Sequence, residues 1–241
     1  MLLDVYFLAL EKLMNLQSAA SVEIFTAEML NLHRGQGRDI LWRTNSYIAS
    51  EEEYIQMVCD KTGGLFRLAI RIMECVSPHF ESISKTQAVM TSAKNSPSDF
   101  ILLSDSLACY FQIRDDLINL ASPKFHLKKG FCEDITEGKL SFIVLHSLRT
   151  FQQQNKEAQL NELLQILKEE TKDVERIKHA LTLSHSTDSF NYTIKYLAKL
   201  YQQIMDIIAR LGGNQKLCSL LESLKDEIED CKDVSGKVIN S

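Results

Sequence analysis

Two adjacent carboxylates lie in an otherwise apolar stretch that is predicted to be helical. Asp115 and Asp116 stand within residues 107–120, with Gln112 before them and Asn119 after them. Because residues three or four apart share a helix face, carboxylate and amide oxygens gather on one side of this helix. Such oxygens suit Mg²⁺, which commonly takes one or two carboxylates together with substrate phosphates. The stretch therefore predicts half of a magnesium–diphosphate site, whereas an isolated Asp-Asp pair would more simply be a solvated acidic patch.

Composition and charge limit the class of protein. The chain has 241 residues, of which 45% are hydrophobic and 24% are charged, as in ordinary soluble globular proteins. This length suits one domain, so we expect residues 1–241 to form a single domain. The net charge of −5, with no basic stripe to offset it, argues against nucleic-acid binding.

The cysteines and the N-terminus indicate a cytoplasmic protein. None of the six cysteines forms a C-x-x-C pair, so we interpret them as reduced thiols rather than as disulfides or zinc ligands. The first residues carry no basic segment ahead of an apolar one, unlike a signal peptide. No apolar run approaches the roughly 20 residues that a transmembrane helix needs.

The spacing of apolar residues predicts helices and no sustained strand, so the expected fold class is all-α, with the helices packed as a bundle. Ser50 and Glu53 have the spacing of a capping box, and the helix that they begin is expected to run on through residues 61–64. Gly212 and Gly213 fit a turn between the last two helices. The expected helices are residues 1–16, 23–43, 50–75, 107–120, 139–151, 160–183, 190–211 and 215–233, with loops at 77–99 and 125–138.

Four segments together resemble a known family of enzymes. Residues 33–43 (HRGQGRDILWR), 61–66 (KTGGLF), 112–116 (QIRDD) and 131–142 (FCEDITEGKLSF) resemble, in order and spacing, the motifs of the trans-isoprenyl diphosphate synthases. The resemblance is closest to geranylgeranyl diphosphate synthases of the animal and fungal type, and it extends over nearly the whole chain. It implies the all-α isoprenoid-synthase bundle.

The resemblance implies a prenyltransferase. Such enzymes ionise an allylic diphosphate and let isopentenyl diphosphate attack the resulting carbocation, here to give geranylgeranyl diphosphate. Departure of the diphosphate needs Mg²⁺ and fixed cations that absorb its negative charge. The implied ligands are therefore the two diphosphate substrates and Mg²⁺.

The resemblance also implies roles for individual residues, which fall into metal ligands, catalytic residues and residues that bind diphosphate. The implied metal ligands are Asp115, Asp116 and Asp39; the catalytic residues are Lys61, Thr62 and Gln112; the diphosphate-binding residues are Lys61, Lys129, Lys139 and Gln36.

Simpler interpretations stand beside these roles. Any of the lysines alone would be a surface residue, and Lys61 differs because the glycines at 63–64 leave room for a substrate beside it. Asp134 is expected to have a structural role or to orient a lysine rather than to bind metal. Arg67 and Arg71, one turn apart on an apolar helix, are expected to face solvent or to be paired.

One part of the family pattern is absent. The family carries two aspartate-rich motifs, the first upstream of the segment that begins near Tyr6, yet Asp4 is the only aspartate in residues 1–31. We therefore expect a partial domain, a bundle truncated at its N-terminus, whose open apolar faces favour a homo-oligomer or association with a full-length homologue. Two alternatives to a self-sufficient enzyme stay open: a non-catalytic partner or regulatory subunit of a complete prenyl synthase, and the prenyltransferase part of a fused terpene synthase.

Overall fold

The regular structure of the chain is helical. The computed structural model describes residues 2–76, 99–122 and 132–232, and every regular element in these ranges is a helix, which confirms the predicted all-α class. None of the helices described there is both long enough and apolar enough to cross a membrane. The elements are α1 (Leu2–Met14), α2 (Ala19–Asn45), α3 (Glu51–Val58), the π-helical turn η1 (Cys59–Gly63), α4 (Gly64–Val76), α6 (Asp99–Ala121), α8 (Glu133–Thr136), α9 (Phe142–Gln153), α10 (Glu157–Lys168), α11 (Val174–His185), α12 (Ser189–Arg210) and α13 (Gln215–Lys232).

One predicted helix is divided in two. Residues 160–183 were expected to be continuous, but α10 ends at Lys168 and α11 begins at Val174. The side chain of Asp173 accepts a hydrogen bond from the backbone N–H of Glu175 at 2.9 Å and so caps the start of α11. This cap marks the start of a separate helix. The spacing of apolar residues continues across the break and so did not reveal it.

The predicted loops also differ in part from the structure. The loop expected at 125–138 contains the single-turn helix α8 in its described part. The helix expected from Lys139 begins at Phe142, so Lys139 lies in the short connection between α8 and α9. Residues 77–98, predicted as a loop, lie outside the described residues, and α6 begins directly after them.

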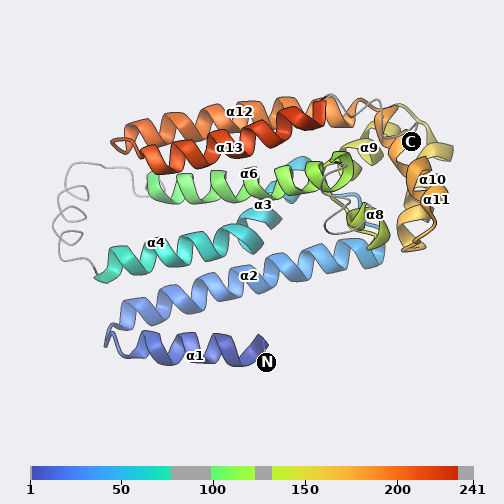
Figure 1. Ribbon diagram of the computed structural model, residues 1–241. Coiled ribbons are helices and arrows are strands. Elements are labelled where there is room, and N and C mark those ends of the chain that lie inside the picture. The colour runs from blue at the N-terminus through green and yellow to red at the C-terminus, as the bar shows by residue number, and fades with distance from the viewer. Residues whose placement is uncertain (1, 77–98, 123–131, 233–241) are drawn as a thin grey trace.

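Helix α6 occupies the middle of the bundle (Figure 1). Helices α12 and α13 lie on one side of it, α3 and α4 lie on the other, α2 and α1 follow further out, and α8 to α11 gather at one end. Side chains on several faces of α6 are buried, and Tyr110, Ile113 and Leu117 have no exposed surface. A helix that is apolar on most sides must be enclosed by others. The Asp-Asp pair therefore lies on the central helix.

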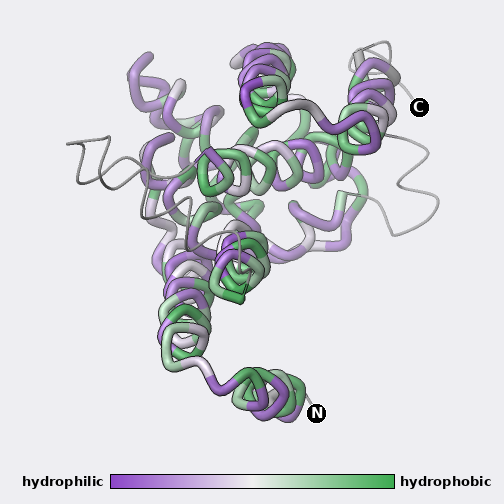
Figure 2. The backbone as a smooth tube through the Cα atoms, turned by 90° about the vertical axis from the view of Figure 1, so that its left-hand side faces the viewer, coloured by the Kyte–Doolittle hydropathy of each residue, from purple (hydrophilic) through white to green (hydrophobic). Residues whose placement is uncertain are grey.

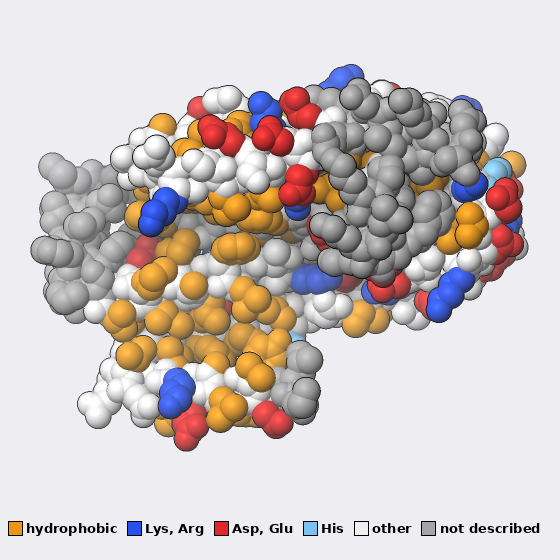
Figure 3. Space-filling view, viewed as in Figure 1, with side chains coloured by type: hydrophobic (Ala, Val, Ile, Leu, Met, Phe, Trp, Pro, Cys, Tyr) orange, Lys and Arg blue, Asp and Glu red, His pale blue; other side chains and the backbone are white. Residues whose placement is uncertain are grey.

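Apolar side chains are exposed on the outer helices. Figure 3 shows them gathered over α1, α2 and α4, and Figure 2 shows α1 at the edge of the molecule. Exposed apolar areas larger than a few hundred Å² are unusual on monomers and mark interaction surfaces. We call these side chains the outer apolar surface: Val5, Phe7, Leu8, Met14, Leu30, Ile40, Leu41, Leu65, Phe66, Met73 and Val76.

Candidate active site

A π-helical turn carries the first two residues of the site. Ser50 and Glu53 form the predicted capping box: the backbone N–H of Glu53 donates to Ser50 Oγ at 3.1 Å, and the backbone N–H of Ser50 donates to Glu53 Oε2 at 2.7 Å. Helix α3 then passes into η1, which holds Lys61 and Thr62, and continues as α4. The predicted continuation through this segment is confirmed. Single π-helical turns are rare and occur often at functional sites.

Two glycines allow neighbouring helices to approach η1. A Cβ atom on Gly35 would lie 2.6 Å from the backbone nitrogen of Lys61, so α2 packs directly on the turn. A Cβ atom on Gly63 would lie 2.9 Å from Arg67 Nη1 and 2.9 Å from Asp105 Oδ1. A side chain at Gly35 would therefore displace the backbone of the turn that holds Lys61, and one at Gly63 would push the Arg67 and Asp105 side chains aside.

The guanidinium of Arg67 fastens η1 to two helices. Arg67 Nη1 donates to the backbone oxygen of Cys59 at 2.9 Å and also contacts Asp105 of α6. Arg67 Nε donates to Glu28 Oε2 of α2 at 3.1 Å, and Arg71 reaches the other Glu28 oxygen at 2.8 Å. Burial opposes the charge of Arg67, but Asp105 and Glu28 outweigh it and raise the pKa of the guanidinium. Arg67 and Arg71 are therefore paired, one of the two outcomes expected from the sequence.

Lys61 meets one of the predicted polar residues of α2. Its Nζ donates to Asp39 Oδ2 at 2.6 Å, and Asp39 is 6% exposed. Gln36 lies almost one turn earlier on α2 and is half-buried. The structure thus brings together Lys61 and Asp39, two residues that are 22 positions apart in the sequence.

Thr62 is connected to α6 through Gln112. The Thr62 hydroxyl donates to Gln112 Oε1 at 3.3 Å, and Gln112 Nε2 donates to Asp116 Oδ1 at 3.0 Å. These two bonds fix which way the amide of Gln112 points, with its carbonyl oxygen towards η1. A carbonyl dipole held in this way can stabilise positive charge that develops beside it.

Asp116 is completely buried and receives four donors. Oδ1 accepts from Lys139 Nζ at 2.7 Å and from Gln112 at 3.0 Å, while Oδ2 accepts from Tyr54 Oη at 2.6 Å and from the backbone N–H of Phe142 at 2.9 Å. Burial would raise the pKa of this carboxyl, but Lys139 and the hydrogen bonds from Tyr54 and Phe142 outweigh burial and lower it. Asp116 is therefore an ionised anchor that joins α3, α6 and the start of α9.

Lys139 is shared between Asp116 and Asp134. Its Nζ lies 3.1 Å from both carboxylate oxygens of Asp134, and the backbone N–H of Asp134 donates to Asn119 Oδ1 at 3.0 Å. Burial raises the pKa of Asp134 to about 7 against the pull of Lys139, and the two carboxylates raise the pKa of Lys139. Asp134 thus orients a lysine, as the sequence indicated.

Asp115 differs from Asp116 in its exposure and in its hydrogen bonding. Its side chain is exposed, and in the described part of the chain it takes part in no hydrogen bond or ion pair. It lies three residues after Gln112 and so shares that face of α6. Within the same described residues, no group of three or more His, Cys, Asp or Glu side chains converges as a complete metal cage. One free carboxylate beside an oriented amide does fit Mg²⁺ that takes the rest of its ligands from water and substrate phosphates.

Comparison with known proteins settles the family. Residues 4–184 match the family described as polyprenyl synthetase. The chain belongs to the polyprenyl synthetase family. It is 40% identical over 222 residues to a geranylgeranyl pyrophosphate synthase of Dictyostelium discoideum, covering 92% of this chain and 66% of that protein.

Two further relatives show the same relation. A protein of Matsumurasca onukii named terpene synthase is 40% identical over 91% of this chain and 65% of its own length. A geranylgeranyl pyrophosphate synthase of Hypoxylon pulicicidum is 42% identical over 88% of this chain and 49% of its own length. The chain thus spans about half to two thirds of the length of these curated relatives.

The predicted roles of the site residues stay predictions in this polyprenyl synthetase structure, and three of them meet a particular obstacle. Lys129 lies outside the described residues. The assignments of Asp116 to the metal and of Lys139 to a diphosphate stay predictions, because each side chain is engaged inside the protein. Either of them would have to give up a buried partner in order to contact a ligand.

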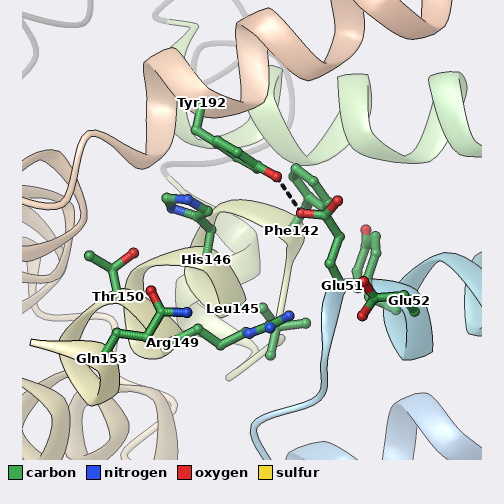
Figure 4. A pocket seen from close by; sticks show the side chains of 10 residues that line it. Glu51, Glu52, Phe142, Leu145, His146, Arg149, Thr150, Gln153 and Tyr192 are labelled. Atoms are coloured by element: carbon green, nitrogen blue, oxygen red, sulfur yellow. Dashed lines mark hydrogen bonds between the residues drawn. The ribbon is translucent and has the colours of Figure 1, made fainter.

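Tyr54, which donates a hydrogen bond to the buried Asp116, was not predicted from the sequence. Tyr54 lies two helical turns before Lys61, and that spacing was the only local signal for it. Tyr54 and Phe142, which both donate to Asp116, also line a cavity of about 270 Å³, which Figure 4 shows from close by. In this cavity Tyr192 donates to Glu51 at 2.6 Å and stacks on His146 at 4.0 Å. No pattern in the sequence indicated this cavity.

Proposed function

We propose that this chain supplies a prenyltransferase site that condenses isopentenyl diphosphate with an allylic diphosphate to give geranylgeranyl diphosphate, with Mg²⁺ as cofactor. The observation that carries the proposal is the contact between η1 and α6. It joins Thr62, the neighbour of Lys61 in η1, to Gln112, on the α6 face that also holds the exposed Asp115. Membership of the polyprenyl synthetase family and the names of the relatives support it.

Each residue has a role in this proposal that its surroundings allow. The Lys61 ammonium lies on a flexible side chain. It leaves its ion pair with Asp39 and pairs instead with the departing diphosphate. The oxygens of Thr62 and Gln112 stabilise the allylic carbocation beside them. The bond between these two residues and the bond from Gln112 to Asp116 fix their orientation. Asp115 holds the metal, which when bound neutralises charge on the leaving diphosphate.

Asp115→Asn tests this proposal. The exchange should lower formation of the twenty-carbon diphosphate from farnesyl diphosphate and isopentenyl diphosphate by about 100-fold or more, the loss typical when one electrostatic contact to the transition state is removed. Product formation across a Mg²⁺ titration is the measurement. Because Asp115 is exposed, we expect the free energy of unfolding to change by no more than about 0.5 kcal/mol.

Asp226→Asn on α13 is the matched control, since it removes an exposed carboxylate away from η1. It should leave product formation unchanged. Unchanged turnover in Asp115→Asn would contradict the role given to Asp115, and a wild-type chain that forms no product at any Mg²⁺ concentration would contradict prenyl transfer by this chain alone.

The outer apolar surface favours a second role, association with another prenyl synthase chain, either a second copy or a full-length homologue. Eleven large apolar side chains of α1, α2 and α4 are exposed, among them Phe7 at 67% and Val5 at 61%. Covering such a surface with the equivalent surface of a second chain removes apolar area from water at roughly 25 cal/mol per Å². A regulatory subunit would use the same surface.

Phe7→Glu should weaken this association. A charge in the middle of an apolar contact has to be desolvated without a partner, so we expect the dissociation constant to rise at least tenfold. Sedimentation velocity over a concentration series, with and without a full-length homologue, measures it. Val174→Glu on α11, which replaces an apolar residue that is 48% exposed elsewhere, should have no effect. A wild-type chain that stays monomeric in both experiments would refute the association.

A further inference from the structure

A second cavity lies between α6, α12 and α13, away from the residues given roles above. Its volume is about 240 Å³, and α12 and α13 run side by side along it above α6 (Figure 1). Its lining is mainly apolar, with Ile194, Leu197 and Ala198 from α12 and Ile228 from α13. A small, apolar, concave space with a few polar groups is the usual form of a binding site for a small molecule.

The floor of this cavity contains a buried donor that has no acceptor. Tyr110 of α6 lines the space, has no exposed surface, and its hydroxyl makes no hydrogen bond in the described structure. Burial raises the pKa of this phenol to about 12, so it stays a donor at any physiological pH. A buried donor without an acceptor is rare in folded proteins, because its desolvation is uncompensated.

A second unpartnered donor lies one turn further along the same face. The Nε atom of Arg114 is buried and makes no hydrogen bond in the described structure, although its guanidinium is ion-paired with Glu227 of α13. Tyr110 and Arg114 are four residues apart, so both side chains lie on the side of α6 that faces α13. Of these two donors, the Tyr110 hydroxyl belongs to a residue that lines the cavity.

The rim of the cavity does not select for charge. Lys225 lies with its Nζ 5.5 Å from the ring centre of Tyr201, and Glu229 stands one turn later on α13. The opposite charges at the mouth cancel, whereas the interior offers apolar contact and the Tyr110 hydroxyl. A neutral ligand thus fits better than an ionised one.

We propose that the cavity between α6, α12 and α13 binds a small neutral molecule, apolar in its body, that ends in a hydrogen-bond-accepting oxygen. The apolar body lies between α12 and α13, and the oxygen accepts from the Tyr110 hydroxyl. This assignment is independent of the function proposed for η1 and Asp115.

Two probes of nearly equal shape test the assignment. Acetophenone carries an acceptor oxygen that ethylbenzene lacks, so calorimetric or ligand-observed NMR titration should show acetophenone binding about 5- to 10-fold more tightly, the equivalent of one hydrogen bond. Tyr110→Phe should abolish that preference and leave ethylbenzene binding unchanged. Because the lost hydroxyl has no partner, the unliganded variant should also be no less stable than the wild type.

Two further variants keep the test decisive. Ala198→Trp places a large ring at the exposed mouth of the cavity and should abolish binding of both probes. Tyr192→Phe removes a hydroxyl that bonds Glu51 in the other cavity and should leave both affinities unchanged. No binding by the wild type, equal affinity for the two probes, or a preference that survives Tyr110→Phe would overturn the proposal. If Tyr110→Phe fails to fold, continued binding to Ala198→Trp would overturn it as well.

Discussion

Replacing Asp116 with asparagine is expected to lower the free energy of unfolding by about 3–5 kcal/mol, which is typical of breaking a buried ion pair from one side. Each carboxylate oxygen of Asp116 accepts two hydrogen bonds. In asparagine one of these oxygens becomes an NH₂ group, which then faces two donors in either orientation of the amide. The Lys139 ammonium is left with Asp134 alone. Urea denaturation at pH 7 measures the loss.

The acid dependence gives an independent check of the same interaction. The pKa of Asp116 is lowered in the folded protein, so its contribution is complete above the unfolded-state pKa of about 3.9 and is lost as the pH falls through the lower folded-state value. The stability difference between wild type and Asp116→Asn should therefore shrink below about pH 4. Asp115→Asn, which differs by one position, should be nearly neutral for stability. Equal losses from the two variants would show that the buried network does not exist in solution.

Replacing Arg67 with methionine is expected to cost about 3 kcal/mol or more of unfolding free energy. The side chain of Glu28 is 3% exposed, and without Arg67 its only charged partner among the described residues is Arg71. The variant also removes the donor that holds the backbone oxygen of Cys59 at the start of η1. Thermal and urea denaturation give the loss. In the reaction proposed above, the KM for the allylic diphosphate should rise because Lys61 is less firmly placed.

Arg71→Met is the matched control for this experiment. Arg71 contacts the same carboxylate, but its side chain is 40% exposed, and within the described residues it forms no hydrogen bond or ion pair with η1. Its loss should cost about 1 kcal/mol or less. Arg67→Lys keeps the positive charge but lacks the planar guanidinium. It should therefore restore part of the stability lost in Arg67→Met but should not restore the wild-type KM. If Arg67→Met and Arg71→Met were equally harmful, Arg67 would have no special role in holding the turn.

Both variants weaken networks that act on the same contact. Asp116 fixes α6 against α3 and α9, and Arg67 fixes η1 against α2 and α6. Between them lies the contact of Thr62 with Gln112. A catalytic arrangement needs such support, because small displacements of a charged or dipolar group reduce transition-state stabilisation steeply.

The sequence alone determined the helical class, most helix positions and the family. These features depend on residues close together in the chain. Apolar residues recur at helical spacing, and Ser50 and Glu53 form a capping box at the start of α3. Gly212 and Gly213 adopt positive φ in the turn that they were expected to form. The KTGGLF and QIRDD segments carry the family resemblance because their residues are contiguous.

Only the tertiary structure decided how the site residues are divided. Asp115 and Asp116 look equivalent in the sequence, yet one is exposed and the other is enclosed by Tyr54, Gln112 and Lys139. Tyr54 is 62 residues from Asp116 in the chain, so no local pattern could pair them. Adjacent residues on a helix point about 100° apart, and which of them meets the interior depends on where the neighbouring helices pack. The cavity lined by Tyr110 could not be predicted for the same reason, since it exists only where α6 packs against α12 and α13, which lie much further along the chain.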